Sequence, residues 1–193
     1  MSSENPETRE KIMRATWDLL ERSSGAGVRM SDIAKAAGIS RQAVYLHFPT
    51  RAELLTCTAR YMDDVHKVDE ALKASRAATG IERLDLWIEA WGGYIPQIHG
   101  VGRALIAMRD TDEAAAAAWT DRMQAVRHGC EAAIRAVEEA GRLKPGLTPA
   151  RATDLLWALV SVEMWEKLRF ECGWSQADYI TTLQAMARDS LTS

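Results

Sequence analysis

Apolar residues recur every three or four positions along most of this chain, which is the period of amphipathic α-helices. The two-residue alternation of a half-buried strand does not occur over any convincing length. Glycine, proline and serine separate the periodic stretches and mark where helices end. The pattern therefore predicts an all-α protein. The predicted helices cover residues 6–22, 30–37, 41–47, 51–75, 81–95, 101–109, 112–139, 149–171 and 176–191.

The stretch from Met30 to Leu55 carries the most information, because it predicts two short helices joined by a tight turn. Gly38 stands where the first of them should stop, and glycine tolerates the left-handed backbone that a helix end often needs. Ser40 is a good N-cap for the next helix. Two short helices at a fixed angle are a common way to place one helix in the DNA major groove.

The second short helix, residues 41–47, has two chemically different faces. Val44 and Phe48 lie four positions apart and should be buried, whereas the opposite face carries four polar side chains. Arginine can bridge two acceptors of guanine, and glutamine can pair with adenine in the same way. Tyrosine and histidine suit phosphate oxygens. The polar side chains are Arg41, Gln42, Tyr45 and His47.

A third helix starts directly after this segment. Thr50 and Glu53 have the spacing of a capping box, in which each side chain binds a backbone N–H of the first turn. Arg51 lies in that first turn, beside backbone N–H groups that attract phosphate. We therefore add Arg51 to the predicted contacts with the DNA backbone.

The segment resembles the DNA-binding domain of the tetracycline-repressor (TetR) family over about the first quarter of the chain. The residues that carry the resemblance are Asp32-Ile33-Ala34, Ala37-Gly38-Ile39-Ser40, Val44-Tyr45-Leu46-His47-Phe48-Pro49-Thr50-Arg51 and Glu53-Leu54-Leu55. The resemblance implies an all-helical homodimer, with an N-terminal helix-turn-helix domain and a variable C-terminal domain that binds a ligand. It further implies that Tyr45, His47 and Arg51 touch the DNA backbone and that Arg41 and Gln42 face bases.

One position departs from the family pattern. Threonine or serine often caps the first helix of the motif, and that position is Arg29 here. Ser31 is able to cap one turn later, with some loss of helix length. We include Ser31 and Ser40 among the predicted DNA-binding residues. The predicted organisation is a DNA-binding domain of residues 1–55, with its motif at about 30–49, and a helical ligand-binding and dimerisation domain of residues 56–193.

Charge and composition set limits on this interpretation. The net charge of −3 over 193 residues at first argues against DNA, but DNA binding needs only one basic face. No apolar run approaches the roughly 20 residues of a membrane helix. The N-terminus is polar, so we expect no signal peptide and a cytoplasmic protein without membrane contact. Three widely spaced cysteines, Cys57, Cys130 and Cys172, indicate neither a disulfide framework nor a metal site. No cofactor is expected.

Aromatic and methionine side chains beyond residue 80 favour an apolar ligand pocket, although packing of a helical core is the better explanation of any single tryptophan. The best candidate cluster lies near Gly92-Gly93 and Pro96, which should disturb the helix that contains them. The effector would be a small, apolar or aromatic molecule. The predicted pocket residues are Trp91, Tyr94, Ile98, Met108, Met123 and His128.

The last two long helices carry apolar residues at helical spacing, which fits either an intrachain core or a four-helix dimer interface with two helices from each subunit. A symmetric dimer would set two recognition helices about one DNA turn (~34 Å) apart, as an inverted-repeat operator requires. The predicted interface residues are Leu155, Leu159, Val162, Trp165, Tyr179, Leu183 and Met186.

The sequence thus favours a ligand-responsive transcriptional regulator, a repressor, that binds double-stranded operator DNA as a homodimer. The alternative is an all-helical protein-interaction module that does not bind DNA. An enzyme is the weakest possibility, because the chain has no glycine-rich phosphate loop, no nucleophile elbow and no HExxH motif, and no catalytic residue is predicted.

Overall fold

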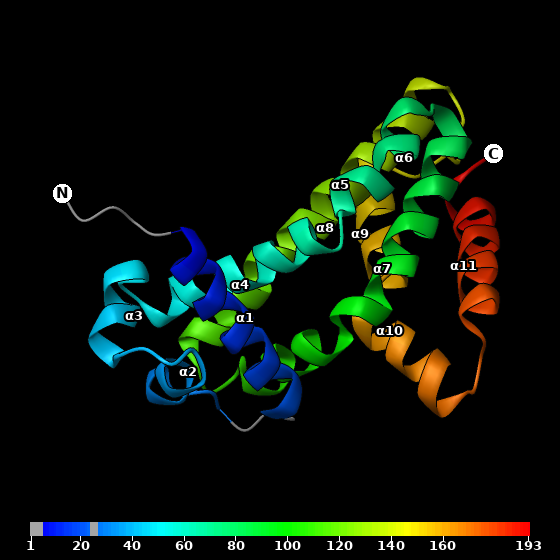
Figure 1. Ribbon diagram of the computed structural model, residues 1–193. Helices are drawn as coiled ribbons and strands as arrows, with labels where there is room; N and C mark the ends of the chain where they lie inside the picture. The colour runs from blue at the N-terminus through cyan, green and yellow to red at the C-terminus, as the bar shows by residue number, and fades with distance from the viewer. Residues whose placement is uncertain (1–5, 24–26) are drawn as a thin grey trace. The chain divides into compact units, whose positions relative to one another are not determined.

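The computed structural model describes residues 6–23 and 27–193 (Figure 1). Over these residues the chain forms helices and no strand, so the predicted all-α class is confirmed. Residues 1–5 of the predicted DNA-binding domain, and residues 24–26, lie outside the described residues. The helices are α1 Pro6–Ser23, α2 Met30–Ala36, α3 Arg41–His47, α4 Arg51–Val65, α5 Val68–Ala71, α6 Lys73–Ala77, α7 Gly80–Met108, α8 Glu113–Glu139, α9 Pro149–Leu159, α10 Val162–Glu166, the π-helix η1 Lys167–Glu171, and α11 Gln176–Leu191.

The chain divides into two compact units. Unit 1 comprises Met1–His66 together with Ile98–Met123, and unit 2 comprises Lys67–Gln97 together with Gln124–Ser193. Each of the long helices α7 and α8 contributes one part to each unit. Unit 1 therefore contains the predicted helix-turn-helix, and unit 2 contains α9, α10, η1 and α11.

The helix starts in the motif follow from short polar side chains that satisfy free backbone N–H groups. The Ser40 hydroxyl accepts a hydrogen bond from the Ala43 N–H at 3.1 Å, which fixes the start of α3. The Thr50 hydroxyl accepts from the Glu53 N–H at 3.1 Å, which fixes the start of α4. In α2 the N-cap position is Arg29, whose side chain makes no capping bond, and α2 still begins at Met30. Ser31 is thus the second residue of α2 and not its cap.

The predicted helix 51–75 is wrong, because this stretch is divided into α4, α5 and α6, with the first interruption after Val65. Lys67 has a positive φ of 53°, a backbone conformation that costs a residue other than glycine free energy. The His66 ring lies next to the Trp17 ring, with centroids 5.3 Å apart and an edge-to-face geometry. Neither glycine nor proline stands at this break, so no local signal marks it.

The predicted helix end before Pro96 and the separate helix 101–109 are also wrong, because α7 runs without interruption from Gly80 to Met108. Proline has no N–H, so Pro96 leaves the carbonyl of Gly92 without its usual helical donor. The side-chain amide of Gln176, at the start of α11, donates a 2.8 Å hydrogen bond to that carbonyl. A side chain from a distant helix therefore replaces the missing backbone bond.

The predicted helix 149–171 is divided into α9, α10 and η1. α9 ends at Leu159 with Val160 as its C-cap, and Ser161 then caps α10 by accepting from the Met164 N–H at 3.3 Å. The indole N–H of Trp91, on α7, donates a 2.8 Å hydrogen bond to the Val160 carbonyl freed by this break. Trp91 is buried, so the break is satisfied inside unit 2.

Unit 2 also contains a close contact between α7 and α8. The Trp87 ring lies so near the backbone of Gly129 that a Cβ atom there would be 2.1 Å from Trp87 Cη2. Glycine is thus required at this position for the tryptophan to fit. Cys130 beside it is buried, and burial raises the pKa of its thiol to about 12. Among the described helices, none is both long and apolar enough to cross a membrane.

Candidate nucleic-acid interface

The turn between α2 and α3 holds the two helices of the motif at a fixed angle. Gly38 has a φ of +64°, the left-handed conformation predicted for it. The N–H of Ile39 donates to the Ala34 carbonyl at 3.0 Å, which closes the end of α2. Ile33, Val44 and Phe48 have no exposed surface, so the predicted apolar faces of both helices are buried. The opposite face of α3 is consequently directed outward.

The exposed face of α3 carries Arg41, Gln42, Tyr45 and one residue that the sequence reasoning missed. The Arg41 guanidinium lies 5.6 Å from the centroid of the Tyr45 ring and donates to its hydroxyl at 3.4 Å. The missed residue, Leu46, is 73 % exposed. Leu46 lies four residues after Gln42 and five after Arg41, so helical spacing places it on the same face and could have identified it. An exposed leucine on this face is able to contact the methyl group of thymine.

His47, at the end of α3, is half-buried, and its backbone is held by Arg9 of α1. Arg9 Nη1 donates to the His47 carbonyl at 2.6 Å, and the guanidinium lies 4.1 Å above the centroid of the Phe48 ring. Arg9 also lies 3.9 Å from a carboxylate oxygen of Glu53 on α4. Arg9 therefore fixes the C-terminal end of α3 against its neighbours. The predicted contact of His47 with phosphate stays a prediction.

Arg51 has partners within its own chain. Its Nη1 lies 2.6 Å from both carboxylate oxygens of Asp112, and its Nε donates to the Val28 carbonyl at 3.0 Å. Its side chain is 21 % exposed. No sequence signal indicates this pairing, because Asp112 is 61 residues away. Arg51 stays a predicted phosphate contact, but its charge is already engaged by a carboxylate.

Asp112 in turn is held by more than Arg51. One of its carboxylate oxygens accepts from the N–H groups of Ala114 and Ala115, at 3.0 and 3.2 Å, so Asp112 caps the start of α8. Burial raises the pKa of the Asp112 carboxyl, but the hydrogen bonds from Arg51 and from these two amides, with the charge of Arg51, outweigh it and lower the pKa overall. The carboxyl is therefore charged at neutral pH.

The six predicted pocket residues are divided between the units. In unit 2, Trp91 and Tyr94 are buried with their rings 6.0 Å apart edge to face, and His128 is exposed. In unit 1, Met108 is buried, whereas Ile98 and Met123 are half-buried. The exposure of His128 does not suit it to the role of a polar anchor in an enclosed pocket. The other five stay predictions.

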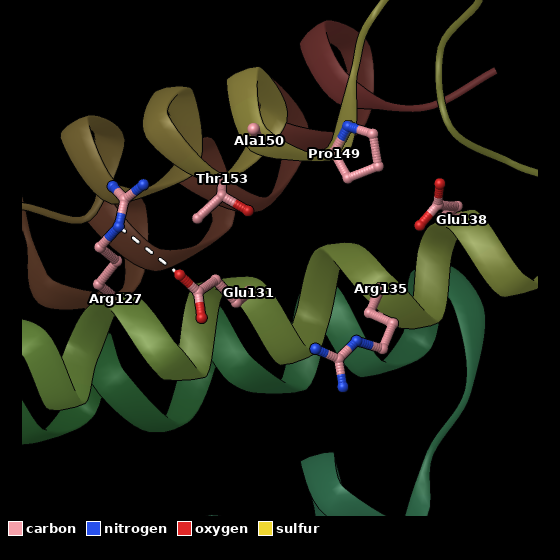
Figure 2. A pocket seen from close by; sticks show the side chains of 7 residues that line it. All are labelled: Arg127, Glu131, Arg135, Glu138, Pro149, Ala150 and Thr153. Atoms are coloured by element: carbon pink, nitrogen blue, oxygen red, sulfur yellow. Dashed lines mark ion pairs between the residues drawn. The ribbon is translucent and has the colours of Figure 1, made fainter.

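One cavity within unit 2 has a different character from the predicted pocket (Figure 2). Its volume is about 200 Å³, and it lies between α8 and the start of α9. None of the six predicted pocket residues lines it. Arg127 lies 3.6 Å from Glu131 and 2.8 Å from Asp154, so these two carboxylates balance the charge of Arg127. The lining residues are Arg127, Glu131, Arg135, Glu138, Pro149, Ala150 and Thr153.

The seven predicted dimer-interface residues also fall into two groups. Leu155 and Met186 are 47 % and 38 % exposed, and Leu159 is half-buried, so all three can meet a partner. The other four are buried within the chain itself and belong to the core of unit 2; they are Val162, Trp165, Tyr179 and Leu183. The sequence reasoning missed Phe170, which is 62 % exposed. Phe170 lies in the π-helix η1, where the α-helical spacing used for the prediction does not apply.

Comparison with known proteins agrees with the geometry of α2 and α3. Residues 12–56 match the model of the family described as bacterial regulatory proteins, tetR family. The HTH-type transcriptional regulator CymR of Pseudomonas putida is 41 % identical over 56 residues, which are 29 % of this chain and 28 % of that protein. The nucleoid occlusion factor SlmA of a Marinomonas species is 27 % identical over 154 residues, covering 78 % of this chain and 75 % of that protein.

The likeness to solved structures extends over nearly the whole chain. NalD, the secondary repressor of the MexAB-OprM multidrug efflux pump in Pseudomonas aeruginosa, superposes with a TM-score of 0.69 at 25 % identity. The superposition covers 97 % of this chain and 98 % of that one. The family match includes the Gly38 turn and the exposed face of α3, so this chain is a DNA-binding transcriptional regulator. The match over residues 12–56 and the likeness to NalD support a regulator of the tetR family.

Proposed function

We propose that this regulator is a homodimeric repressor that binds an inverted-repeat operator through α3 and is released by a small apolar or aromatic effector. The observation that carries the proposal is the exposed face of α3, where Arg41 and Gln42 are exposed while Val44 is fully buried. The N-terminal 55 residues would serve as the DNA-binding domain and the remainder as the ligand-binding and dimerisation domain. The site of action would be the cytoplasm, where the operator is.

The dimer supplies what one copy of α3 lacks. A seven-residue helix reaches only a few base pairs, so tight specific binding needs a second copy about one DNA turn (~34 Å) away. The exposed apolar side chains of unit 2 support such pairing, because removing leucine, phenylalanine and methionine surface from water stabilises the dimer. Leu155, Phe170 and Met186 are the candidates.

The effector would act by a population shift. It would bind better to a dimer whose recognition helices do not match the spacing of the two half-sites, and so lower the affinity for DNA. The aromatic rings of Trp91 and Tyr94 are the kind of side chain that suits an apolar or aromatic effector. Screening by thermal shift tests this directly: an effector should raise the melting temperature and weaken operator binding together. We propose binding, and not turnover, as the activity of the chain.

The first test is a gel shift with the DNA that flanks the gene, repeated over a series of salt concentrations. A protein that neutralises phosphates loses affinity steeply as salt rises. Binding that is absent, or that does not depend on salt, would favour the protein-interaction module instead. Sedimentation of the free protein over a concentration series tests the dimer.

Two variants of Arg41 sharpen this test. If Arg41 bridges a guanine, Arg41→Ala should weaken the free energy of binding to the operator by about 1–3 kcal/mol. It should also relax the preference for the operator over scrambled DNA. Arg41→Lys keeps the charge but loses the bidentate geometry, so it should lose the same preference while keeping the salt dependence. If both variants discriminate the two DNAs as well as the parent does, Arg41 does not read a base.

A further inference from the structure

Two arginine–aspartate pairs whose arginine lies on α4 join this helix to the first turns of α8 within unit 1. Arg51 pairs with Asp112 at 2.6 Å, at the start of both helices. Two to three turns further along, Arg60 Nη2 lies 2.5 Å from Asp121. In a third pair the two residue types are exchanged, with Arg122 on α8 and Asp63 on α4. The start of α8 is therefore attached to α4 by charged side chains.

The two pairs differ in what their arginine can do. Arg60 is 59 % exposed, and it lies in the middle of α4. Arg51 is the first residue of α4, directly after the Thr50 cap, where backbone N–H groups and the positive end of the helix dipole favour phosphate. It is also the residue at which the motif predicts a backbone contact. Only the Arg51 pair thus involves a side chain with a proposed role on DNA.

A carboxylate and a phosphate bind a guanidinium in the same way, through paired N–H···O bonds. Asp112 occupies Nη1 of Arg51 with both of its oxygens. A phosphate that takes this nitrogen must displace the carboxylate or share it, and sharing places two negative charges side by side. The free energy of the Arg51–Asp112 pair is therefore subtracted from any contact that Arg51 makes with DNA through this nitrogen.

We propose that Asp112 competes with a DNA phosphate for Arg51, so that this ion pair between α4 and α8 lowers and sets the affinity for DNA. The proposal rests on the proposed function, because it needs a protein that binds DNA. It makes Asp112 a positioning residue: it does not touch DNA but determines where the charge of Arg51 is held. Any signal that strengthens the contact between Asp112 and Arg51 weakens DNA binding, and any signal that loosens it does the reverse.

The chain offers a clean variant and a matched control. Asp112→Asn removes the charge while keeping a side-chain oxygen, and asparagine is as good an N-cap as aspartate, so α8 should still start at the same place. Asp121→Asn removes one negative charge from the same helix and also breaks a pair with an α4 arginine, but it leaves Arg51 untouched. A melting curve for each variant checks that it folds. If Asp112→Asn has a clearly lower melting temperature than the parent, Asp112→Ser, another good cap without charge, takes its place.

The measurement is the dissociation constant for operator and for scrambled DNA over a salt series. Releasing one arginine for one phosphate contact should tighten binding to both DNAs on the order of fivefold near 0.1 M salt and steepen the log–log salt slope by about 0.9. Asp121→Asn should match the parent in slope. In the double variant Asp112→Asn/Arg51→Ala, the gain should disappear.

Each other outcome overturns the inference. If Asp112→Asn binds as Asp121→Asn does, the pair does not restrain Arg51. If Asp112→Asn weakens binding, the pair instead holds Arg51 in its productive position. If the gain survives in the Arg51→Ala background, it is a general effect of charge. Absence of DNA binding by the parent protein is a different result, because it removes the proposed function itself.

Discussion

In unit 1, arginine side chains connect helices that are far apart in the sequence, whereas in unit 2 tryptophan and glutamine side chains bind backbone carbonyls across helices. Arg51 and Arg60 join α4 to α8 in the first unit. Trp91 and Gln176 join α7 to the ends of α9 and α11 in the second. Unit 2 also has ion pairs, such as Arg188 with Asp85, but the buried bond from Trp91 to the Val160 carbonyl is neutral.

This difference concerns how easily a contact can be exchanged. An exposed or half-exposed ion pair contributes about 0–1 kcal/mol, is screened by salt, and can be replaced by another anion. A buried hydrogen bond to a backbone carbonyl is different, because breaking it leaves the carbonyl unsatisfied at a cost of about 1–3 kcal/mol. The comparison therefore predicts that substitutions in unit 2 change stability and that charge changes in unit 1 mainly change binding.

The largest expected effect is at Gly129, where a Cβ would lie 2.1 Å from Trp87 Cη2. Because the Trp87 ring is buried, making room for the Cβ must shift packed atoms, so Gly129→Ala should lower the free energy of unfolding by about 3 kcal/mol or more. Chemical denaturation measures this. Gly93→Ala is the control, because no atom lies within 4 Å of a Cβ at Gly93 and alanine should stabilise the helix by about 0.5–1 kcal/mol. Equal effects at both glycines would mean that the α7–α8 contact is not tight.

A medium effect is expected at Gln176. Gln176→Ala removes the 2.8 Å hydrogen bond to the Gly92 carbonyl and should cost about 1–3 kcal/mol of unfolding free energy. Pro96→Ala supplies an N–H to the same carbonyl, so it should recover part of that cost in the double variant. Denaturation of the parent, the two single variants and the double variant gives the coupling energy. Purely additive effects would show that Gln176 does not compensate for the proline.

The smallest effect is expected on acidification, and it should come from unit 1. Hydrogen bonds from Arg60, opposed by burial and assisted by Arg122, lower the pKa of Asp121, and that of Asp112 is lowered as well. A carboxyl whose pKa is lower in the folded state stabilises the protein above its ordinary pKa of 3.8. That contribution, about 1 kcal/mol or less for each pair, is lost as the pH falls further through the folded-state pKa.

The comparison is between the parent and the double variant Asp112→Asn/Asp121→Asn. The stability difference between them should shrink as the pH is lowered from 5 to below the folded-state pKa values, because both aspartates of the parent become neutral there. A difference that stays constant across this range would show that neither pair contributes to stability through its charge.

The motif was predictable because its signals are local. Ser40 and Thr50 cap the helices that they precede, and Gly38 adopts the conformation for which glycine is needed. The buried face of α3 followed from the spacing of Val44 and Phe48. The same spacing also places Leu46 on the exposed face, although only the polar residues of that face were predicted as contacts.

The breaks and continuations of the long helices were not predictable, because distant residues decide them. Pro96 would end an isolated helix, and the amide of Gln176 from 84 residues away allows α7 to continue. Conversely, nothing near Val160 or Lys67 forbids a helix, yet the chain is interrupted at both. The pairing of Arg51 with Asp112 is of the same kind, since spacing along the sequence says nothing of contacts across 61 residues.

The uncapped start of α2 has a consequence for local motion. Arg29 offers no side-chain acceptor to the first N–H groups of α2, whereas Ser40 does so for α3. In a helix of seven residues the first turn is about half of the whole, so losing it costs little more than losing one or two backbone bonds. Amide hydrogens at the start of α2 should therefore exchange with solvent through local opening, well before those of α3. Of the two helices of the motif, α3, which we propose contacts DNA, is therefore expected to be the more persistent, and the first turn of α2 the less persistent.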